Sequence, residues 1–280
     1  MSDAKQESRR RWGAAASAWE AYGAALRRQT MPVSSWMVEA IQPQPGDTLL
    51  ELAAGPGDTG FLAAELVLPG GTLITSDLAP EMLMVARRRS EVLGLGNVRF
   101  KQIDAETSID VEAASIDGVL CRWGYMLMTD SETALRETRR VLKPGRRVAL
   151  AAWRGPEENP WSAIPGRELV RRGLVEPLAP GEPGQFAWAQ EGLIAEQLDA
   201  AGFVEHEVDE VRFTHVYPSM DDYWRTQSEM SGRMQTALAG AEPAVVEEIK
   251  AAVAAQVADF MRPDGSLELP ASTWVAVAEA

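Results

Sequence analysis

Short apolar runs alternate with helix-length segments through the middle of the chain, between residues 48 and 153. The apolar runs are residues 48–53, 72–76, 98–103, 116–121 and 147–153. Strands that alternate with helices form a parallel sheet covered on both faces, because each connecting helix packs back onto the sheet. Right-handed connections limit the arrangement to a doubly wound α/β sheet, which binds ligands beyond the carboxyl ends of its strands.

Changes in pattern divide the rest of the chain. Apolar residues at helical spacing predict helices over 9–28 and 32–41, and the sequence QPQPGD at 42–47 ends the second helix. After Trp153, two irregular or helical segments flank further strands. The expected parts of a single domain, residues 1–280, are a helical lid (1–41), a ligand-binding core (42–154), cap insertions (155–188 and 219–262) and last strands (203–213 and 267–279).

The composition excludes several classes of partner and site. The net charge is −14, so the surface repels the phosphate groups of nucleic acids and of anionic membranes. One cysteine, Cys121, allows neither an internal disulfide nor a cysteine-rich metal site. The two histidines, His206 and His215, are too few for a zinc site built from several imidazoles, and we expect no metal. The run Arg87–Arg89 is interpreted as a solvated helix face.

No targeting or membrane segment is expected. The N-terminus lacks the apolar core of a secretory signal, and no apolar run approaches membrane-spanning length. The expected location is therefore the cytoplasm.

The turn after the first strand contains a glycine motif. The sequence LLELAAGPGDTG, residues 49–60, places Gly55, Gly57 and Gly60 in the pattern G-x-G-x-x-G. Glycines at such a turn let the backbone bend sharply and approach a ligand closely. The pattern alone describes a nicotinamide or flavin site equally well.

Charge around this turn separates the candidate ligands. From Gln29 to Ala86 the sequence contains no lysine or arginine but seven acidic residues. A dinucleotide would place a pyrophosphate over the turn, where Asp58 competes for the backbone N–H groups. S-adenosylmethionine carries a sulfonium and an ammonium but no phosphate, and Glu51 is well placed to bind the ammonium. The alternative is that Glu51 and Asp58 only cap and solvate the turn.

Residues after the second and third strands suit a nucleoside. Asp77 ends the second strand, where a carboxylate can accept both ribose hydroxyls of either NAD or S-adenosylmethionine. Leu78 and Met82 can pack on an adenine face, although ordinary core packing explains Met82 equally well. Asp104 can accept a hydrogen bond from the adenine amino group while the Ala105 N–H serves a ring nitrogen; the alternative for Asp104 is a surface turn.

Five motifs in order give a resemblance over about residues 40–155. The motifs are E-x-x-x-G-x-G (51–57), SDLAPEML (76–83), QIDAE (102–106), VLCRWGYMLMTD (119–130) and RRVLKPGRRVAL (139–150). The chain resembles the class I S-adenosylmethionine-dependent methyltransferases, and most closely the group that includes the ubiquinone/menaquinone C-methyltransferases and many bacterial small-molecule methyltransferases. The resemblance implies S-adenosylmethionine as cofactor and the Rossmann-like strand order 3-2-1-4-5-7-6 with the last strand antiparallel. The turn Lys143–Arg146 departs from the usual K-P-G-G, which should alter only that turn.

The resemblance and the residues together give a set of expected contacts. Expected cofactor contacts are Glu51, Ala53, Gly55, Gly57, Asp77, Leu78, Met82, Asp104, Ala105, Glu106 and Cys121, with Trp19 and Tyr22 closing over them from the lid. The expected acceptor pocket is aromatic and contains Trp123, Tyr125, Trp161, Trp188 and Trp224. Candidates for a base or orienting group are His215 and Tyr125, whereas His206 alternates with valines and is interpreted as structural.

Several questions stay open on the sequence. No substrate motif is recognised after Trp153, so neither the acceptor nor the methylated atom follows from the resemblance. The expected partner is a small-molecule acceptor, with no nucleic acid and no membrane, and a homodimer is an assembly that the sequence leaves open. The competing functions are an NAD(P)-dependent oxidoreductase and a non-catalytic S-adenosylmethionine-binding protein.

Overall fold

A seven-stranded sheet of order β3-β2-β1-β4-β5-β7-β6 forms the centre of the protein in the computed structural model, which describes residues 3–179 and 181–280. The strands are β1 (Thr48–Glu51), β2 (Thr72–Asp77), β3 (Val98–Gln102), β4 (Ile116–Arg122), β5 (Leu142–Trp153), β6 (Val204–Tyr217) and β7 (Leu267–Glu279). β1 to β5 pair in parallel, whereas β7 runs antiparallel to both β5 and β6. The predicted strand order is confirmed. It reverses between β1 and β4, where such sheets bind ligands.

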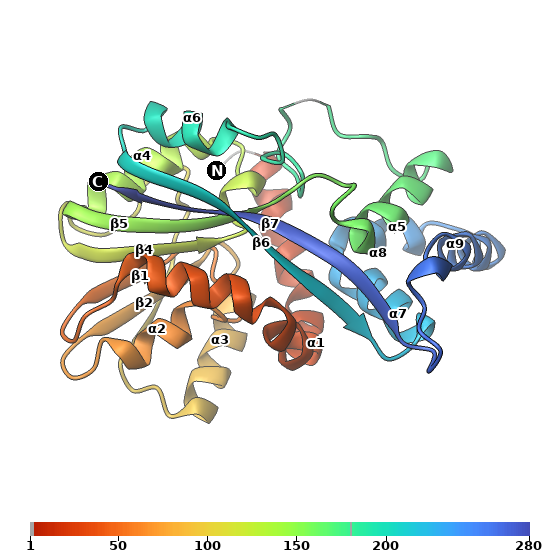
Figure 1. Cartoon of the computed structure of the whole chain (residues 1–280), viewed down its shortest axis with the longest axis horizontal. Coiled ribbons are helices and arrows are strands. Elements are labelled where there is room, and N and C mark those ends of the chain that lie inside the picture. Colours follow the sequence, from red (N-terminus) through yellow and green to blue (C-terminus); the bar gives the residue numbers. More distant parts are fainter. Residues whose placement is uncertain (1–2, 180) are drawn as a thin grey trace.

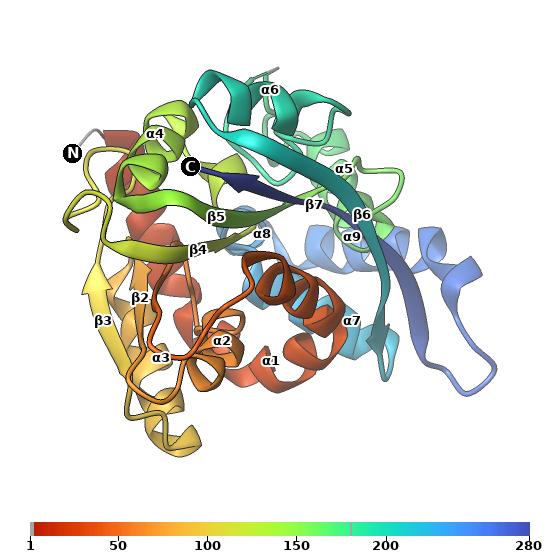
Figure 2. The same ribbon diagram turned by 60° about the vertical axis from the view of Figure 1, so that its left-hand side comes forward.

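Helices cover both faces of this sheet (Figures 1 and 2). They are α1 (Asp3–Ile41), α2 (Gly60–Leu66), α3 (Pro80–Leu93), α4 (Ser131–Val141), α5 (Pro160–Arg171), α6 (Leu193–Ala200), α7 (Met220–Met230), α8 (Gly232–Ala239) and α9 (Pro243–Gln256), with short 3₁₀ helices η1 (Tyr125–Leu127) and η2 (Ala258–Phe260). α4 and α6 lie on one face, and α2, α3 and the second half of α1 lie on the other. β4 lies between them and is buried from Ile116 to Cys121, since helices cover both of its faces.

α1 is one continuous helix, so the prediction of two N-terminal helices with a break before Pro32 is wrong. Proline inside a helix removes a hydrogen bond and costs about 3 kcal/mol. Val33, Met37 and Ile41 continue the helical spacing past Pro32 and are buried against the sheet. Each buried side chain of this size contributes roughly 1.5–3 kcal/mol. The packing therefore outweighs the proline.

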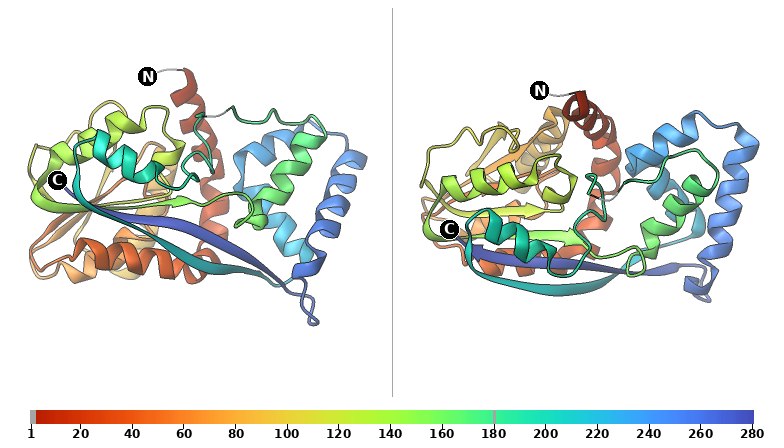
Figure 3. Two further views of the ribbon diagram at one scale, coloured as in Figure 1. Left: turned by 45° about the horizontal axis from the view of Figure 1, so that its top comes forward. Right: turned by 90° about the horizontal axis from the view of Figure 1, so that it is seen from above.

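A group of helices beyond the sheet, α5 and α7–α9, is called the cap here. Figure 3 shows the cap beside the sheet, with the first half of α1 running between the two. The outer ends of β6 and β7 extend under the cap, and Leu267, Leu269 and Tyr217 pack there against Tyr223, Ile249 and other cap residues. β6 continues four residues past the predicted end at residue 213, because its pairing with β7 runs on to Tyr217 and Leu267. His215 consequently lies inside a strand and not after it.

No described helix combines the length and the apolar character needed to cross a membrane.

Candidate active site

A cavity of about 1470 Å³ opens at the carboxyl ends of the central strands and continues under the cap. Glu51, Asp77 and Arg122, which end β1, β2 and β4, line its inner part. Residues of α1, α5, α7 and α8 and of the segments 175–179 and 181–187 line much of the rest. Typical small-molecule sites occupy roughly 300–1,000 Å³, so this cavity has room for two ligands at once.

The glycine turn and Asp77 form a cradle at the inner end of the cavity. The Gly55 backbone has φ +54° and its N–H donates to Asp77 Oδ2 over 2.8 Å. Asp77 Oδ1 accepts the Ala79 N–H over 2.9 Å, so the carboxylate joins the turn to the start of α3. Burial raises the pKa of Asp77. Each carboxylate oxygen keeps a free lone pair, which suits a ligand that offers two hydroxyl groups.

The other two motif glycines support the cradle from behind. A Cβ at Gly57 would lie 2.6 Å from the Phe61 ring, and a Cβ at Gly60 would lie 2.3 Å from Glu51 Oε2. Gly57 is not among the described residues that line the cavity, and its role as a ligand contact stays a prediction. It is needed where the turn packs on α2. Ala53, with φ +49°, and Gly55 do line the cavity, as predicted.

Glu51 presents one unused oxygen. Its side chain is 3% exposed, and Oε1 accepts the Gly60 N–H over 2.8 Å. Oε2 has no hydrogen-bond partner in the described part of the chain. Burial raises the pKa of this carboxyl to about 7. A cation in the cavity beside Oε2 would compensate the buried charge.

Three arginines converge on Asp58, at the start of α2. Asp58 lies 2.8 Å from Arg89, 3.1 Å from Arg122 and 3.5 Å from Arg27. These residues come from α3, β4 and α1, outside the stretch that contains no basic residue. Asp58 is thus paired, and the inner cavity carries both signs of charge; the sequence argument from local acidity missed this. Arg89 is largely buried, which contradicts its interpretation as solvated.

The loop after β3 meets the beginning of α1. The Lys5 ammonium lies 3.3 Å from Asp104 Oδ2 and 3.7 Å from Glu106 Oε2. Asp104, Ala105 and Glu106 all line the cavity, as do Leu78 and Met82. An adenine at this edge would therefore meet an aspartate already paired with a lysine.

α1 also places aromatic residues along the cavity. Trp19 lines it and packs near Met82, and its Nε1–H is buried without a partner among the described residues. Tyr22 does not belong to the described lining: its hydroxyl donates to Glu229 Oε2 over 2.7 Å and so ties α1 to α7. The Tyr22 side chain thus lies on the side of α1 that faces the cap, and its closing over a ligand stays a prediction.

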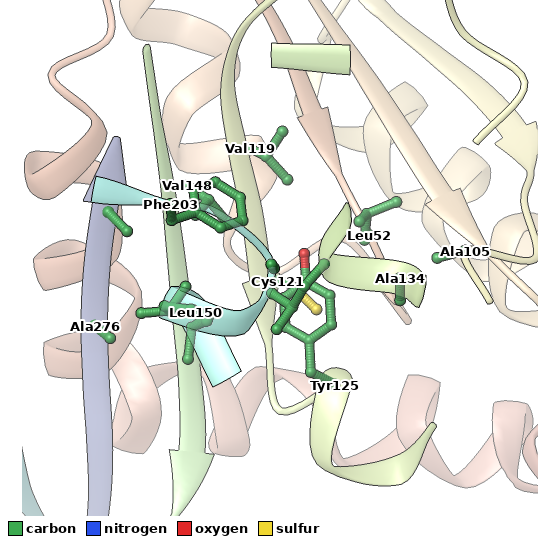
Figure 4. Close-up of a cluster of buried hydrophobic side chains, with 14 of the residues drawn as sticks. Leu52, Ala105, Val119, Cys121, Tyr125, Ala134, Val148, Leu150, Phe203 and Ala276 are labelled. Atoms are coloured by element: carbon green, nitrogen blue, oxygen red, sulfur yellow. The ribbon is translucent and has the colours of Figure 1, made fainter. Parts of the chain in front are cut away.

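Three further predicted residues lie in the protein core. Tyr125 is 2% exposed, bonds Thr138 Oγ1 over 2.7 Å and stacks on Trp188 at 5.9 Å. Figure 4 shows Tyr125 and Cys121 among buried apolar side chains of the sheet and α4. Tyr125, Cys121 and Trp188 are absent from the described cavity lining. The structure therefore places the predicted acceptor or base residue Tyr125, the predicted cofactor contact Cys121 and the predicted acceptor residue Trp188 in the core, outside the described lining of the cavity. Tyr125 lies there because η1 turns its ring towards α4.

Trp224 is the remaining misplaced residue. It lies on α7 and packs against the apolar core of the cap, and the described lining of the cavity does not include it. Neighbouring residues Thr226 and Gln227 line the cavity instead. α7 therefore does border the cavity, but with the face that contains Thr226 and Gln227 and not with the face that contains Trp224.

Aromatic side chains line the continuation of the cavity, which we call the aromatic arm: Trp123, Trp153, Trp161, His215 and Tyr217. Trp123 and Trp153 stack at 4.2 Å, Trp153 and Trp161 are 5.0 Å apart, and Trp161 is 4.5 Å from the His215 ring. Trp123, Trp161 and His215 were predicted in this region. Trp153 was not assigned a role, although its position at the end of a parallel strand was a signal for one.

No group of three metal-ligating side chains occurs in residues 3–179 and 181–280.

Known methyltransferases are similar to this chain in sequence. A family model described as a methyltransferase domain matches residues 43–170. A nocamycin O-methyltransferase of Saccharothrix syringae is 31% identical over 186 residues, 62% of this chain and 65% of its own. A ubiquinone/menaquinone biosynthesis C-methyltransferase of Pasteurella multocida is 37% identical over 120 residues, 42% of this chain and 44% of its own. Each match spans less than two thirds of the relative.

Among solved structures, the YcgJ protein from Bacillus subtilis has the same fold. Its TM-score is 0.56 at 18% identity, and the match covers 88% of this chain and 97% of that one.

Proposed function

The chain belongs to the class I S-adenosylmethionine-dependent methyltransferases, and from this premise we propose that it transfers a methyl group from S-adenosylmethionine to a small organic acceptor. When bound, the cofactor supplies an electrophilic methyl group on a sulfonium. The residues of the chain bind and orient both ligands and exclude water from them.

One observation carries the proposal: the same cavity is lined by Glu51, which has an oxygen without a hydrogen-bond partner among the described residues, and by the Gly55–Asp77 cradle. Glu51 would receive the cofactor ammonium, which explains why a carboxylate is buried there with one oxygen unsatisfied. Asp77 would receive the ribose hydroxyls, and Leu78, Met82 and Ala105 would border the adenine. These residues fit a cationic nucleoside.

Arg122 extends this set to the cofactor carboxylate. It lines the cavity, and its guanidinium bonds Asp58 and Thr30 while lying 4.4 Å from the Trp123 ring. A guanidinium has five N–H donors, so donors remain for a ligand carboxylate. Glu51 would thus bind the ammonium of the methionine moiety of S-adenosylmethionine, and Arg122 would bind its carboxylate.

The acceptor would occupy the aromatic arm. Trp123 directly follows β4, and Trp153 is the last residue of β5. The two rings stack, so the arm begins beside the cofactor cradle and continues under the cap. The named relatives methylate or take part in the biosynthesis of small organic compounds, nocamycin and the quinones, and this supports a small acceptor here. Their names include both O- and C-methylation, so they do not select the atom.

Calorimetric titration of the whole chain with S-adenosylmethionine, S-adenosylhomocysteine, NAD⁺ and NADP⁺ tests the cofactor. We expect the first two to bind and the nicotinamide cofactors not to. Incubation with radiolabelled S-adenosylmethionine and a panel of phenols, quinols and amines then tests transfer. Binding of NAD⁺ in place of S-adenosylmethionine would support an oxidoreductase, and cofactor binding without transfer to any acceptor would support a non-catalytic binding protein.

A further inference from the structure

The imidazole of His215 is held in one tautomer by α1. Gln29 donates its amide Nε2–H to the Val216 carbonyl over 2.7 Å, which leaves Gln29 Oε1 facing His215 Nδ1 at 2.8 Å. An amide oxygen only accepts, so Nδ1 must carry the proton and Nε2 must be the bare acceptor. Gln29 and His215 are 186 positions apart and meet because α1 crosses β6.

The bare nitrogen lies in the aromatic arm without a partner. His215 is 2% exposed and lines the cavity, and Nε2 has no hydrogen-bond donor within the described chain. The centroids of the Trp161 and His215 rings lie 4.5 Å apart. A buried acceptor without a donor costs free energy, and a ligand that supplies the donor recovers it.

The surroundings of Nε2 select the kind of donor. Trp153, Trp161 and Tyr217 place aromatic faces around the imidazole, which favours a planar ring in the ligand. A carboxylate has only acceptor oxygens, so it cannot donate a hydrogen bond to Nε2 and would be repelled by its lone pair. The same burial lowers the pKa of His215 to about 3, so this environment disfavours any cation, including a ligand ammonium. A neutral donor remains, and of the neutral donors a hydroxyl group on a planar ring is the one that methyl transfer can also use as the acceptor.

We propose that Nε2 of His215 accepts a hydrogen bond from a neutral hydroxyl group on a planar acceptor, such as a phenol or an enol, and that Gln29 is the positioning residue that fixes the imidazole for it. The hydroxyl group approaches Nε2 from the cavity, which His215 and Trp161 both line. This inference rests on the proposed function, since it names the acceptor of that site. A nitrogen so weakly basic can accept a hydrogen bond from a hydroxyl group but is a poor general base for removing its proton. The role of His215 is therefore recognition of the acceptor.

Nitrogen-15 NMR of the imidazoles tests the tautomer. The chain has two histidines, so His206→Asn leaves the His215 signals alone in the spectrum. We expect a pyrrole-type Nδ1 and a pyridine-type Nε2. Gln29→Met should mix the two tautomers, and Gln29→Glu, which keeps an acceptor oxygen, should restore the first. A protonated Nε2 in the wild type, or an unchanged spectrum in Gln29→Met, would overturn the proposal.

Three ring-matched probes test the donor, each titrated in the presence of S-adenosylhomocysteine: 2-naphthol, 2-naphthoate and 2-naphthylmethylammonium. We expect 2-naphthol to bind at least about tenfold more tightly than either ion and to shift the Nε2 signal. His215→Asn keeps a donor for Gln29 but removes Nε2, and should weaken 2-naphthol alone by about tenfold. His206→Asn is the control and should leave all three affinities unchanged.

The outcomes separate this inference from the proposed function. Equal binding of the three probes, no binding of 2-naphthol, or an unchanged 2-naphthol affinity in His215→Asn would overturn the inference while S-adenosylhomocysteine still binds. Failure of the wild type to bind S-adenosylhomocysteine would overturn the proposed function and the inference with it.

Discussion

The Lys5 ammonium lies 3.3 Å from Asp104 Oδ2, so the first turn of α1 is fastened to the loop after β3 across the mouth of the cavity. Both side chains are mostly buried, 11% and 19% exposed. Removing one partner of a mostly buried pair leaves the other charge without compensation, which costs more than the loss of an exposed pair, about 0–1 kcal/mol. From this contact we propose that the first half of α1 acts as a lid over the cofactor.

Lys5→Met is expected to loosen this lid. Amides of residues 5–20 should exchange with deuterium faster in the free protein, and the affinity for S-adenosylmethionine should fall a few fold. Deletion of residues 1–28 should lower the affinity for S-adenosylmethionine further, because it also removes Trp12 and Trp19. Hydrogen-exchange mass spectrometry and calorimetry measure both effects.

Arg10→Met is the matched control for Lys5→Met. Arg10 also lies on α1, but it pairs with Glu7 on the same exposed helix face and fastens α1 to nothing else that the structure describes. Exchange and affinity should both stay as in the wild type. Equal exchange in Lys5→Met and Arg10→Met would contradict a lid fastened by Lys5, and an unchanged affinity after the deletion would contradict any lid.

The cradle predicts a large loss of cofactor affinity in Asp77→Ala. The variant removes the acceptor for the Gly55 and Ala79 N–H groups as well as for the ribose. Hydrogen bonds to a charged group contribute about 1.5–3 kcal/mol, so affinity should fall by about 100-fold. Asp264→Ala, at an exposed turn where Asp264 also accepts a backbone N–H, should leave it unchanged. Similar affinities for both variants would count against the cradle.

Gly55→Val tests the same cradle through the backbone. Valine is strained at the positive φ of this residue, and its side chain would stand where the cofactor is expected. The affinity for S-adenosylmethionine should fall at least about tenfold, since a strain of 1–3 kcal/mol accompanies the lost space. Calorimetry that found wild-type affinity in this variant would place the cofactor elsewhere.

The sheet was predictable because its signals are local. Each buried strand is an apolar run, and Gly94 and Pro80 mark the ends of α3 within the sequence itself. The turn at Gly55 and the acid at Asp77 follow strands directly, so their place at the sheet edge follows from the topology. These residues do line the cavity.

The misplaced residues depended on directions that spacing does not encode. Tyr125 follows β4 as closely as Trp123 does, but the η1 turn sends its ring into the core. The arginines around Asp58 and the bond from Gln29 to His215 join elements far apart in the chain. The packing of α1, α3 and β4 in the folded chain brings such pairs together, and the periodicity of the sequence does not predict that packing.

Asp58→Asn is expected to destabilise the protein by about 3–5 kcal/mol. Asp58 is 5% exposed, and the substitution would leave three guanidinium groups near one another with their shared carboxylate removed. Breaking a buried ion pair from one side costs that much because an uncompensated charge stays buried. Urea unfolding measures the effect. Asp110→Asn, which removes an exposed partner of Lys101, should change stability by less than about 1 kcal/mol; comparable losses in both would show that the arginine cluster adds nothing.

Glu51 should make stability fall as pH rises. Its pKa is raised from 4.5 to about 7 by burial, so the folded state holds a proton that the unfolded state has lost between these values. Stability from this group is therefore complete below about pH 4.5 and is lost through pH 7, by about 3 kcal/mol in all. The difference in unfolding free energy between the wild type and Glu51→Gln isolates the contribution of Glu51. The opposite pH dependence that comes from the neutral His215 is present in both proteins and cancels. A difference in unfolding free energy that stays constant from pH 4 to pH 8 would contradict the buried, protonated carboxyl.

Cofactor binding should then expel the proton from Glu51. An ammonium placed beside Oε2 favours the charged carboxylate and lowers its pKa, so binding near pH 7 releases a fraction of a proton to the buffer. Titrations of S-adenosylmethionine in phosphate and in Tris, whose ionisation enthalpies differ, should give different observed enthalpies for the wild type. Glu51→Gln should bind more weakly and show a smaller difference between the two buffers. If the wild type released no proton while binding tightly, the ammonium would lie away from Glu51, and the unused oxygen would need another explanation.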